Sequence, residues 1–138
     1  MTQAPGPARD FASIKVGDEF VRRFIVTAAD LESFSKLSGD VNPLHLDADF
    51  ARELGYKDRV AYGALAVAYI SRVIGVDFPG PGTVWLSQNI RFEAPVYVGD
   101  TLAVKVKVLK KTEPLRALSL SVEVTKESDP AKKTASGT

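Results

Sequence analysis

The clearest pattern in this chain is a strict alternation of residue types in its second half. Every second position is Leu or Val in residues 101–108, and the same holds for residues 117–124. Because successive side chains of a strand point to opposite faces, each segment predicts a strand with one buried and one solvated face. Residues 111–114, which end in a proline, lie between the two segments and predict the connection of an antiparallel hairpin.

The first half of the chain predicts helices instead. Thr27 and Asp30 have the spacing of a capping box, with Asp in place of the usual Glu. A helix is therefore expected after Thr27 and ending at Gly39, with three apolar residues on one face: Leu31, Phe34 and Leu37. Asp47 is expected to cap a further short helix that runs through Leu54.

Residues 63–74 predict the main helix. Residues 64–70 within it are apolar nearly all round, so this helix is expected to be buried rather than amphipathic. The Pro- and Gly-rich segment 78–82 ends it. After this break, residues 83–92 predict a strand, and residues 18–26 predict another one ahead of the first helix.

Together these elements predict one α+β domain over residues 13–128, with helices in the first half and antiparallel strands in the second. Residues 1–12 contain two prolines and a glycine and show no periodicity, so they predict a flexible leader. Residues 129–138 are polar and predict a tail. A length of 138 residues fits one domain with a core of its own.

Charge and composition exclude several partners. The formal net charge is only +1, so no basic excess exists to neutralise a nucleic acid backbone. The longest strongly apolar stretch, residues 64–70, is far shorter than the ~20 residues that span a membrane. Residues 1–10 lack the apolar core of a secretory signal. We therefore expect a soluble, cytoplasmic protein that binds neither nucleic acid nor membrane.

The chain has no cysteine and one histidine, His45. Disulfides, thiol nucleophiles and cysteine-based metal sites are excluded, as are sites that need two imidazoles. The side chains left for acid–base catalysis are therefore this imidazole and the carboxylates, unless the protein carries out no such catalysis. Asp40 lies five residues before His45, across a turn-rich segment, and the two could hold one water between them. The same residues could equally serve only to form turns and local hydrogen bonds.

Gly63 opens the main helix and has two interpretations of the same kind. Backbone amides at a helix N-terminus can bind an oxyanion. A glycine at this place can also serve only to allow close packing.

Three stretches carry a resemblance to a known family: SGDVNPLHLD at 38–47, FPGPGTVWLSQ at 78–88 and APVYVGDTL at 94–102. They resemble the motifs of the MaoC-like (R)-specific enoyl-CoA hydratases, and of the related type 2 3-hydroxyacyl-thioester dehydratases. The resemblance extends over residues 16–124.

This resemblance implies a hotdog fold, in which an antiparallel sheet wraps around one long central helix. It implies a homodimer with acyl-thioester tunnels near the subunit interface. It also implies the reversible addition of water to a trans-2-enoyl thioester of CoA or acyl carrier protein, which gives the (R)-3-hydroxyacyl product. The implied chemistry uses no metal and no cofactor.

The resemblance also implies site residues. Asp40 and His45 match the catalytic pair: His45 takes a proton from water as oxygen attacks C3, and Asp40 delivers a proton to C2. Gly63 matches the glycine whose amide stabilises the thioester oxyanion, and Asn42 the motif asparagine that shapes the loop or holds water. Tyr62 stands where the family usually has histidine, and is expected to narrow the pocket or rearrange its hydrogen bonds.

A second departure lies at residues 135–138, where the sequence stops as though just before the apolar strand that usually closes the family's sheet.

Two alternatives to the hydratase remain open. One is a catalytically silent hotdog subunit that binds acyl chains or a partner. The other is an acyl-CoA thioesterase, in which water attacks the carbonyl carbon rather than C3. Neither chain-length preference nor the choice between CoA and carrier protein follows from the sequence.

Overall fold

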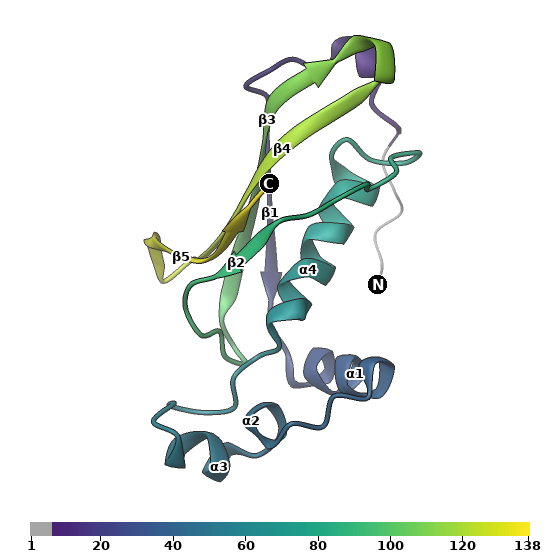
Figure 1. The fold of residues 1–138 in the computed structure, drawn as a ribbon. Helices are drawn as coiled ribbons and strands as arrows, with labels where there is room; N and C mark the ends of the chain where they lie inside the picture. The colour runs from purple at the N-terminus through teal and green to yellow at the C-terminus, as the bar shows by residue number, and fades with distance from the viewer. Residues whose placement is uncertain (1–6) are drawn as a thin grey trace.

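The two alternating segments pair with each other inside a five-stranded antiparallel sheet (Figure 1). The computed structural model describes residues 7–138. The strands lie in the order β1-β3-β4-β5-β2, with these bounds: β1 Glu19–Ile25, β2 Ile90–Phe92, β3 Thr101–Thr112, β4 Ala117–Lys126 and β5 Asp129–Gly137. Every pairing is antiparallel, as predicted.

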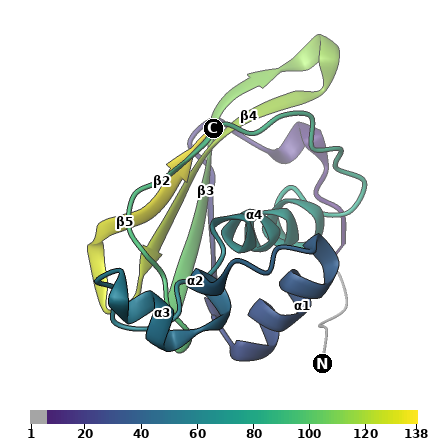
Figure 2. The same ribbon diagram turned by 60° about the horizontal axis from the view of Figure 1, so that its bottom comes forward.

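Within residues 7–138, four α-helices accompany the sheet: α1 Ala28–Ser38, α2 Pro43–Leu46, α3 Ala48–Glu53 and α4 Gly63–Arg72. Helix α4 lies along one face of the sheet, and α1, α2 and α3 gather at one end of it (Figures 1 and 2). Helix α4 continues as one π-helical segment, η2 Val73–Asp77, so the helical stretch runs beyond the predicted end at residue 74. Short 3-10 turns occur at η1 Phe11–Ser13 and η3 Glu113–Leu115.

The core lies between α4 and the sheet. On β3 and β4 the aliphatic positions face one another across the ladder, with Val104 opposite Val124 and Val106 opposite Val122. All four are buried, and they belong to one cluster with Ile70 of α4. Burial of one such side chain is worth about 1.5–3 kcal/mol. The predicted buried face of the two strands and the predicted buried central helix are therefore confirmed.

The predicted capping box of α1 is present. The Asp30 amide donates to Thr27 Oγ1 over 3.1 Å, and the Thr27 amide donates to Asp30 Oδ2 over 2.9 Å. The helix ends at Gly39, whose φ of 75° is in the left-handed region. The predicted apolar face is correct for buried Leu31 and wrong for Leu37, which is 86% exposed in the single chain.

Two strand predictions need correction. Of the predicted strand 83–92, only Ile90–Phe92 form a strand, β2, which pairs with β5, and the adjacent Asn89 exchanges two backbone hydrogen bonds with Thr138. The predicted polar tail 129–138 is wrong for Asp129–Gly137, which form β5 between β4 and β2.

Of the predicted leader, residues 1–12, the structure describes residues 7–12. Residues 1–6 lie outside the described residues. Residues 7–10 have no regular secondary structure, and η1 begins at Phe11, where the Asp10 carboxylate accepts the Ala12 amide. Within residues 7–138, no helix has both the length and the apolar character needed to cross a membrane.

Candidate active site

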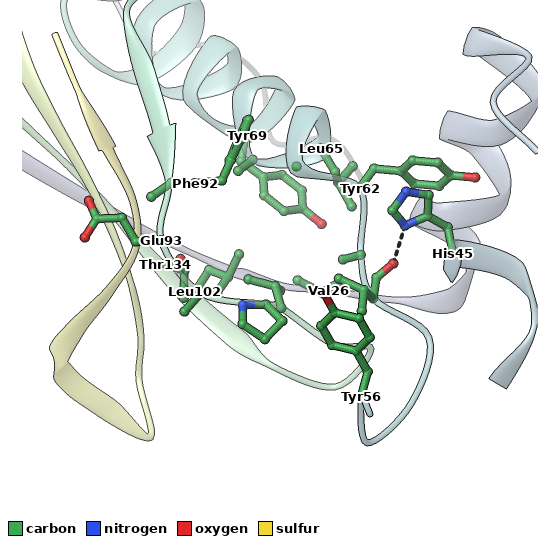
Figure 3. A pocket seen from close by; sticks show the side chains of 18 residues that line it. Val26, His45, Tyr56, Tyr62, Leu65, Tyr69, Phe92, Glu93, Leu102 and Thr134 are labelled. Atoms are coloured by element: carbon green, nitrogen blue, oxygen red, sulfur yellow. Dashed lines mark hydrogen bonds between the residues drawn. The ribbon is translucent and has the colours of Figure 1, made fainter. Parts of the chain in front are cut away.

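A cavity of about 390 Å³ lies between the N-terminal half of α4 and the sheet. Most of its wall is apolar, with Val26, Leu65 and Leu102 among the lining residues. Figure 3 shows His45 and Tyr62 close together on one side of the cavity, and Phe92 and Thr134 on the other. The cavity thus has the imidazole of His45 at one end. The other end, here called the apolar end, is mostly apolar apart from Glu93 and Thr134.

His45 reaches the cavity because a short helix holds it there. Pro43 is the first residue of α2, where a missing amide costs nothing, and Asn42 caps this helix by accepting the Leu44 amide at Oδ1 over 3.1 Å. His45 therefore lies in the last turn of a four-residue helix that the sequence pattern showed only as a turn. The Val60 amide donates to the Leu44 carbonyl over 3.1 Å, which ties α2 to the chain entering α4.

The imidazole of His45 has a defined tautomer. Its Nδ1 lies 2.6 Å from the carbonyl oxygen of Val60. A carbonyl only accepts, so Nδ1 must carry the hydrogen and donate it. In the neutral ring Nε2 then keeps its lone pair. His45 is consequently set up to accept a proton at Nε2.

Tyr62 is 4% exposed and lies immediately before α4. Its ring centroid lies 4.0 Å from that of His45 and 4.7 Å from that of Phe34. Its hydroxyl donates to the backbone carbonyl of Asp40 over 2.7 Å. Tyr62 therefore contacts both residues of the predicted catalytic pair, through its ring on one side and its hydroxyl on the other.

The carboxylate of Asp40 is not part of the cavity wall. Asp40 Oδ1 accepts the amide of Asn42 over 3.0 Å, a local turn that aspartate commonly forms, and the residue is exposed. Among the described residues that line the cavity, His45, Tyr62 and Gly63 are present and Asp40 and Asn42 are not. The structure thus brings three of the five predicted site residues to the cavity and leaves two in the adjoining loop.

Gly63 is the first residue of α4, and its amide belongs to the first turn, where amides have no acceptor within their own helix. It lines the cavity together with His45. A Cβ atom at this position would lie 3.1 Å from the ring of Phe92. The oxyanion and the close-packing interpretations of this glycine are therefore both compatible with its surroundings.

Residues of the apolar end were not predicted. Tyr69 lies two turns after Tyr62 on α4 and lines the same cavity, so its spacing of seven residues was the available signal. Its hydroxyl donates to Asp30 Oδ2 over 3.1 Å. Burial and the nearby Asp30 carboxylate raise the pKa of Tyr69 well above its ordinary value of 10.0. This phenol stays neutral at physiological pH and forms part of the wall.

A comparison with known protein families shows which family this fold belongs to. Residues 10–130 match the family described as MaoC like domain. The chain belongs to this family. Its MaoC-like domain therefore covers the elements from η1 through β4, and the resemblance of the three sequence motifs is confirmed.

Two curated relatives of this MaoC-like protein are named (R)-specific enoyl-CoA hydratases. One, from Rhodospirillum rubrum, is 38% identical over 98 residues, which are 71% of this chain and 68% of the relative. The other, from Aeromonas caviae, is 35% identical over 114 residues, which are 80% of this chain and 84% of the relative.

Among solved structures, an unliganded R-hydratase from Pseudomonas aeruginosa superposes with a TM-score of 0.86 at 37% identity. The match covers 92% of this chain and 80% of that one. Together with the antiparallel sheet and the central helix α4, this similarity confirms the predicted α+β hotdog fold.

Proposed function

We propose that this MaoC-like protein catalyses the reversible, (R)-specific addition of water to trans-2-enoyl thioesters, and is therefore a hydro-lyase. The observation that carries the proposal is the bond from His45 Nδ1 to the Val60 carbonyl, which leaves Nε2 free to accept a proton beside an apolar cavity. The names of the curated relatives support the same reaction.

In the proposed mechanism, His45 Nε2 removes a proton from water as the water oxygen forms a bond to C3. The electron pair of the C2–C3 double bond moves towards the thioester carbonyl, whose oxygen becomes negative. The amide of Gly63 donates to that oxygen, an interaction that can supply ~3–4 kcal/mol in comparable sites. Asp40, in its carboxylic acid form, then delivers a proton to C2, which restores the carbonyl and completes the (R)-3-hydroxyacyl product. Transfer of the proton held by His45 to the Asp40 carboxylate returns both groups to their starting states.

The two residues outside the cavity wall have proposed parts in this reaction. Asp40 Oδ1 is occupied by the Asn42 amide, so the second carboxylate oxygen, Oδ2, is the one assigned to proton transfer. Asn42 shapes the loop, because its side chain caps α2 and thereby sets the position of His45. No resident metal or redox group has a part in this mechanism. The substrate is a thioester of CoA or acyl carrier protein, and the proposed location of the reaction is the cytoplasm.

The functional unit in this proposal is a homodimer. Val41, beside Asp40, is 70% exposed in the single chain, and Val84 and Leu86 in the segment before β2 are 76% and 82% exposed. Val84 and Leu86 lie two residues apart, and neighbouring exposed aliphatic side chains mark interaction surfaces. A second copy that also covers Val41 would exclude water from the Asp40 loop. Light scattering should give a mass about twice 14.9 kDa, whereas a monomer would contradict this part.

Hydration of crotonyl-CoA tests the proposal, followed as loss of the conjugated enoyl absorbance with chiral analysis of the product. The wild type should form the (R)-3-hydroxyacyl thioester, and Asp40→Asn and His45→Ala should each lose most activity. Asp49→Asn is the matched control, because Asp49 is an exposed residue of α3 and pairs with Arg52.

Two other outcomes identify the alternatives. Release of free CoA, detected with a thiol reagent, would identify a thioesterase. A folded wild type that is inert towards CoA and carrier-protein substrates alike would contradict the hydratase proposal, and would favour the silent subunit.

A further inference from the structure

Tyr62 contacts three residues of the proposed mechanism but has no part of its own in that mechanism. Tyr62 is joined to Gly63 by a peptide bond, its ring contacts His45 at 4.0 Å, and its hydroxyl donates to the Asp40 carbonyl. We propose that Tyr62 is a positioning residue that holds the Asp40 loop in place relative to His45 and the Gly63 amide. The inference rests on the proposed function of the site.

The hydroxyl of Tyr62 is committed to the loop rather than to the cavity. It donates over 2.7 Å to the carbonyl of Asp40, which also accepts the hydroxyl of Ser35 over 3.1 Å. Ser35 belongs to α1 and Tyr62 immediately precedes α4, so one carbonyl is held from two helices. Since Asp40 itself is exposed and lies in a loop, these two bonds fix its backbone. With its proton used in this way, Tyr62 does not donate to water in the cavity.

The ring of Tyr62 restrains the imidazole. It is buried between Phe34 and His45, and its plane is tilted by 36° to that of the imidazole. Because protein interiors are close-packed, a ring with neighbours on both sides cannot swing away without displacing one of them. His45 is thus held by its bond to Val60 and by the Tyr62 ring, and Nε2 has one direction in which to point.

Tyr62→Phe separates these two contacts, because it removes the hydroxyl and keeps the ring. Loss of one neutral hydrogen bond of ordinary strength corresponds to about a 3- to 10-fold effect. We expect kcat for crotonyl-CoA to fall by about this factor with KM little changed, since the cavity wall is kept. The control is Tyr97→Phe, another buried tyrosine, which lies outside the cavity. A kcat within about 1.5-fold of wild type would overturn the proposal.

A double-mutant cycle tests whether the hydroxyl acts through Asp40. In the Asp40→Asn background, which keeps the backbone carbonyl but lacks the carboxylate, Tyr62→Phe should lower the residual rate by less than about twofold. A merely structural role would lower the rate by the same factor in both backgrounds. Equal factors would therefore overturn the proposal.

Amide hydrogen exchange provides a readout that does not depend on activity. In Tyr62→Phe the amides of residues 40–42, 44 and 45 should exchange faster than in the wild type, while exchange in β3 and β4 stays unchanged. An unchanged loop would overturn the inference even if the enzyme is active. A wild type without hydratase activity would instead reject the proposed function, and the exchange data would still decide whether Tyr62 holds the loop.

Discussion

The two ends of the cavity are built on different principles. At the end with His45, Tyr62 and the Asp40 loop, groups are held by hydrogen bonds from side chains to backbone carbonyls, each spanning fifteen or more residues of sequence. At the other end, Leu102 and its neighbours are held by burial in the main core. The hydrogen bonds orient a few atoms and contribute little net stability. Burial of apolar side chains excludes water and supplies most of the stability.

Substitutions at the two ends of the cavity should therefore have different effects. Changes to the hydrogen-bonding groups of the polar end should reduce the rate and leave the free energy of unfolding nearly intact, provided that the ring of Tyr62, which belongs to the core cluster, is kept. Changes at the apolar end should reduce that free energy first. Variants at each end test whether the effects on rate and on stability are separate.

The largest expected effect is at His45. His45→Ala should lower kcat/KM for crotonyl-CoA by about 10²- to 10⁴-fold, the usual contribution of a general base, or about 3–5.5 kcal/mol of barrier. His45→Asn is the sharper variant, because its amide can still donate to the Val60 carbonyl but lacks Nε2. Both should be equally inactive, with His45→Asn the more stable on urea denaturation. A loss below tenfold in His45→Asn would show that Nε2 is not the base.

The next effect is on stability. Leu102 is buried, lines the cavity and packs in the main core. Leu102→Ala should lower the free energy of unfolding by about 2–5 kcal/mol, because it removes buried methyl groups and leaves a void. Leu37→Ala is the control, since Leu37 is largely exposed and its loss should stay within about 0.5 kcal/mol. If urea denaturation gave similar values for both variants, the apolar end would not be part of the core.

The smallest effect concerns Tyr69 at high pH. Burial and the Asp30 carboxylate raise the pKa of Tyr69 above 10.0 in the folded chain, so folding favours the neutral phenol. That contribution is complete below pH 10.0 and is lost as the pH rises towards the folded pKa. The stability difference between wild type and Tyr69→Phe should therefore shrink above pH 10.0, as measured by urea denaturation at about pH 9 and pH 11. Parallel stabilities over this range would contradict the role of burial and Asp30.

The parts of the fold that follow local rules could be predicted from the sequence. The alternation on β3 and β4 and the capping box of α1 each depend on neighbouring residues, and both were found as expected. Strand β5 could not be found in this way, because its first residues are polar and it is stabilised by pairing with β4 and β2 on its two sides. Conversely, residues 83–88 have a strand-like sequence but belong to no strand.

The candidate site shows the same limit. His45, Tyr62 and Gly63 were identified from the resemblance, and the structure places all three at one cavity. The partner of each group could not be predicted, since the Tyr62 hydroxyl reaches a carbonyl 22 residues away and His45 one that is 15 residues away. Such contacts depend on how helices pack, and a backbone carbonyl leaves no trace in the sequence.

The most direct test of the account uses the fact that the chain has a single histidine. Nitrogen-15 NMR of protein labelled at histidine gives one pair of ring signals, at a pH where the ring is neutral. The account predicts a protonated Nδ1, held by the Val60 carbonyl, and an unprotonated Nε2 that accepts a hydrogen bond from water. A proton on Nε2 with a bare Nδ1 would contradict it, because His45 would then have no lone pair directed at the water it is proposed to activate.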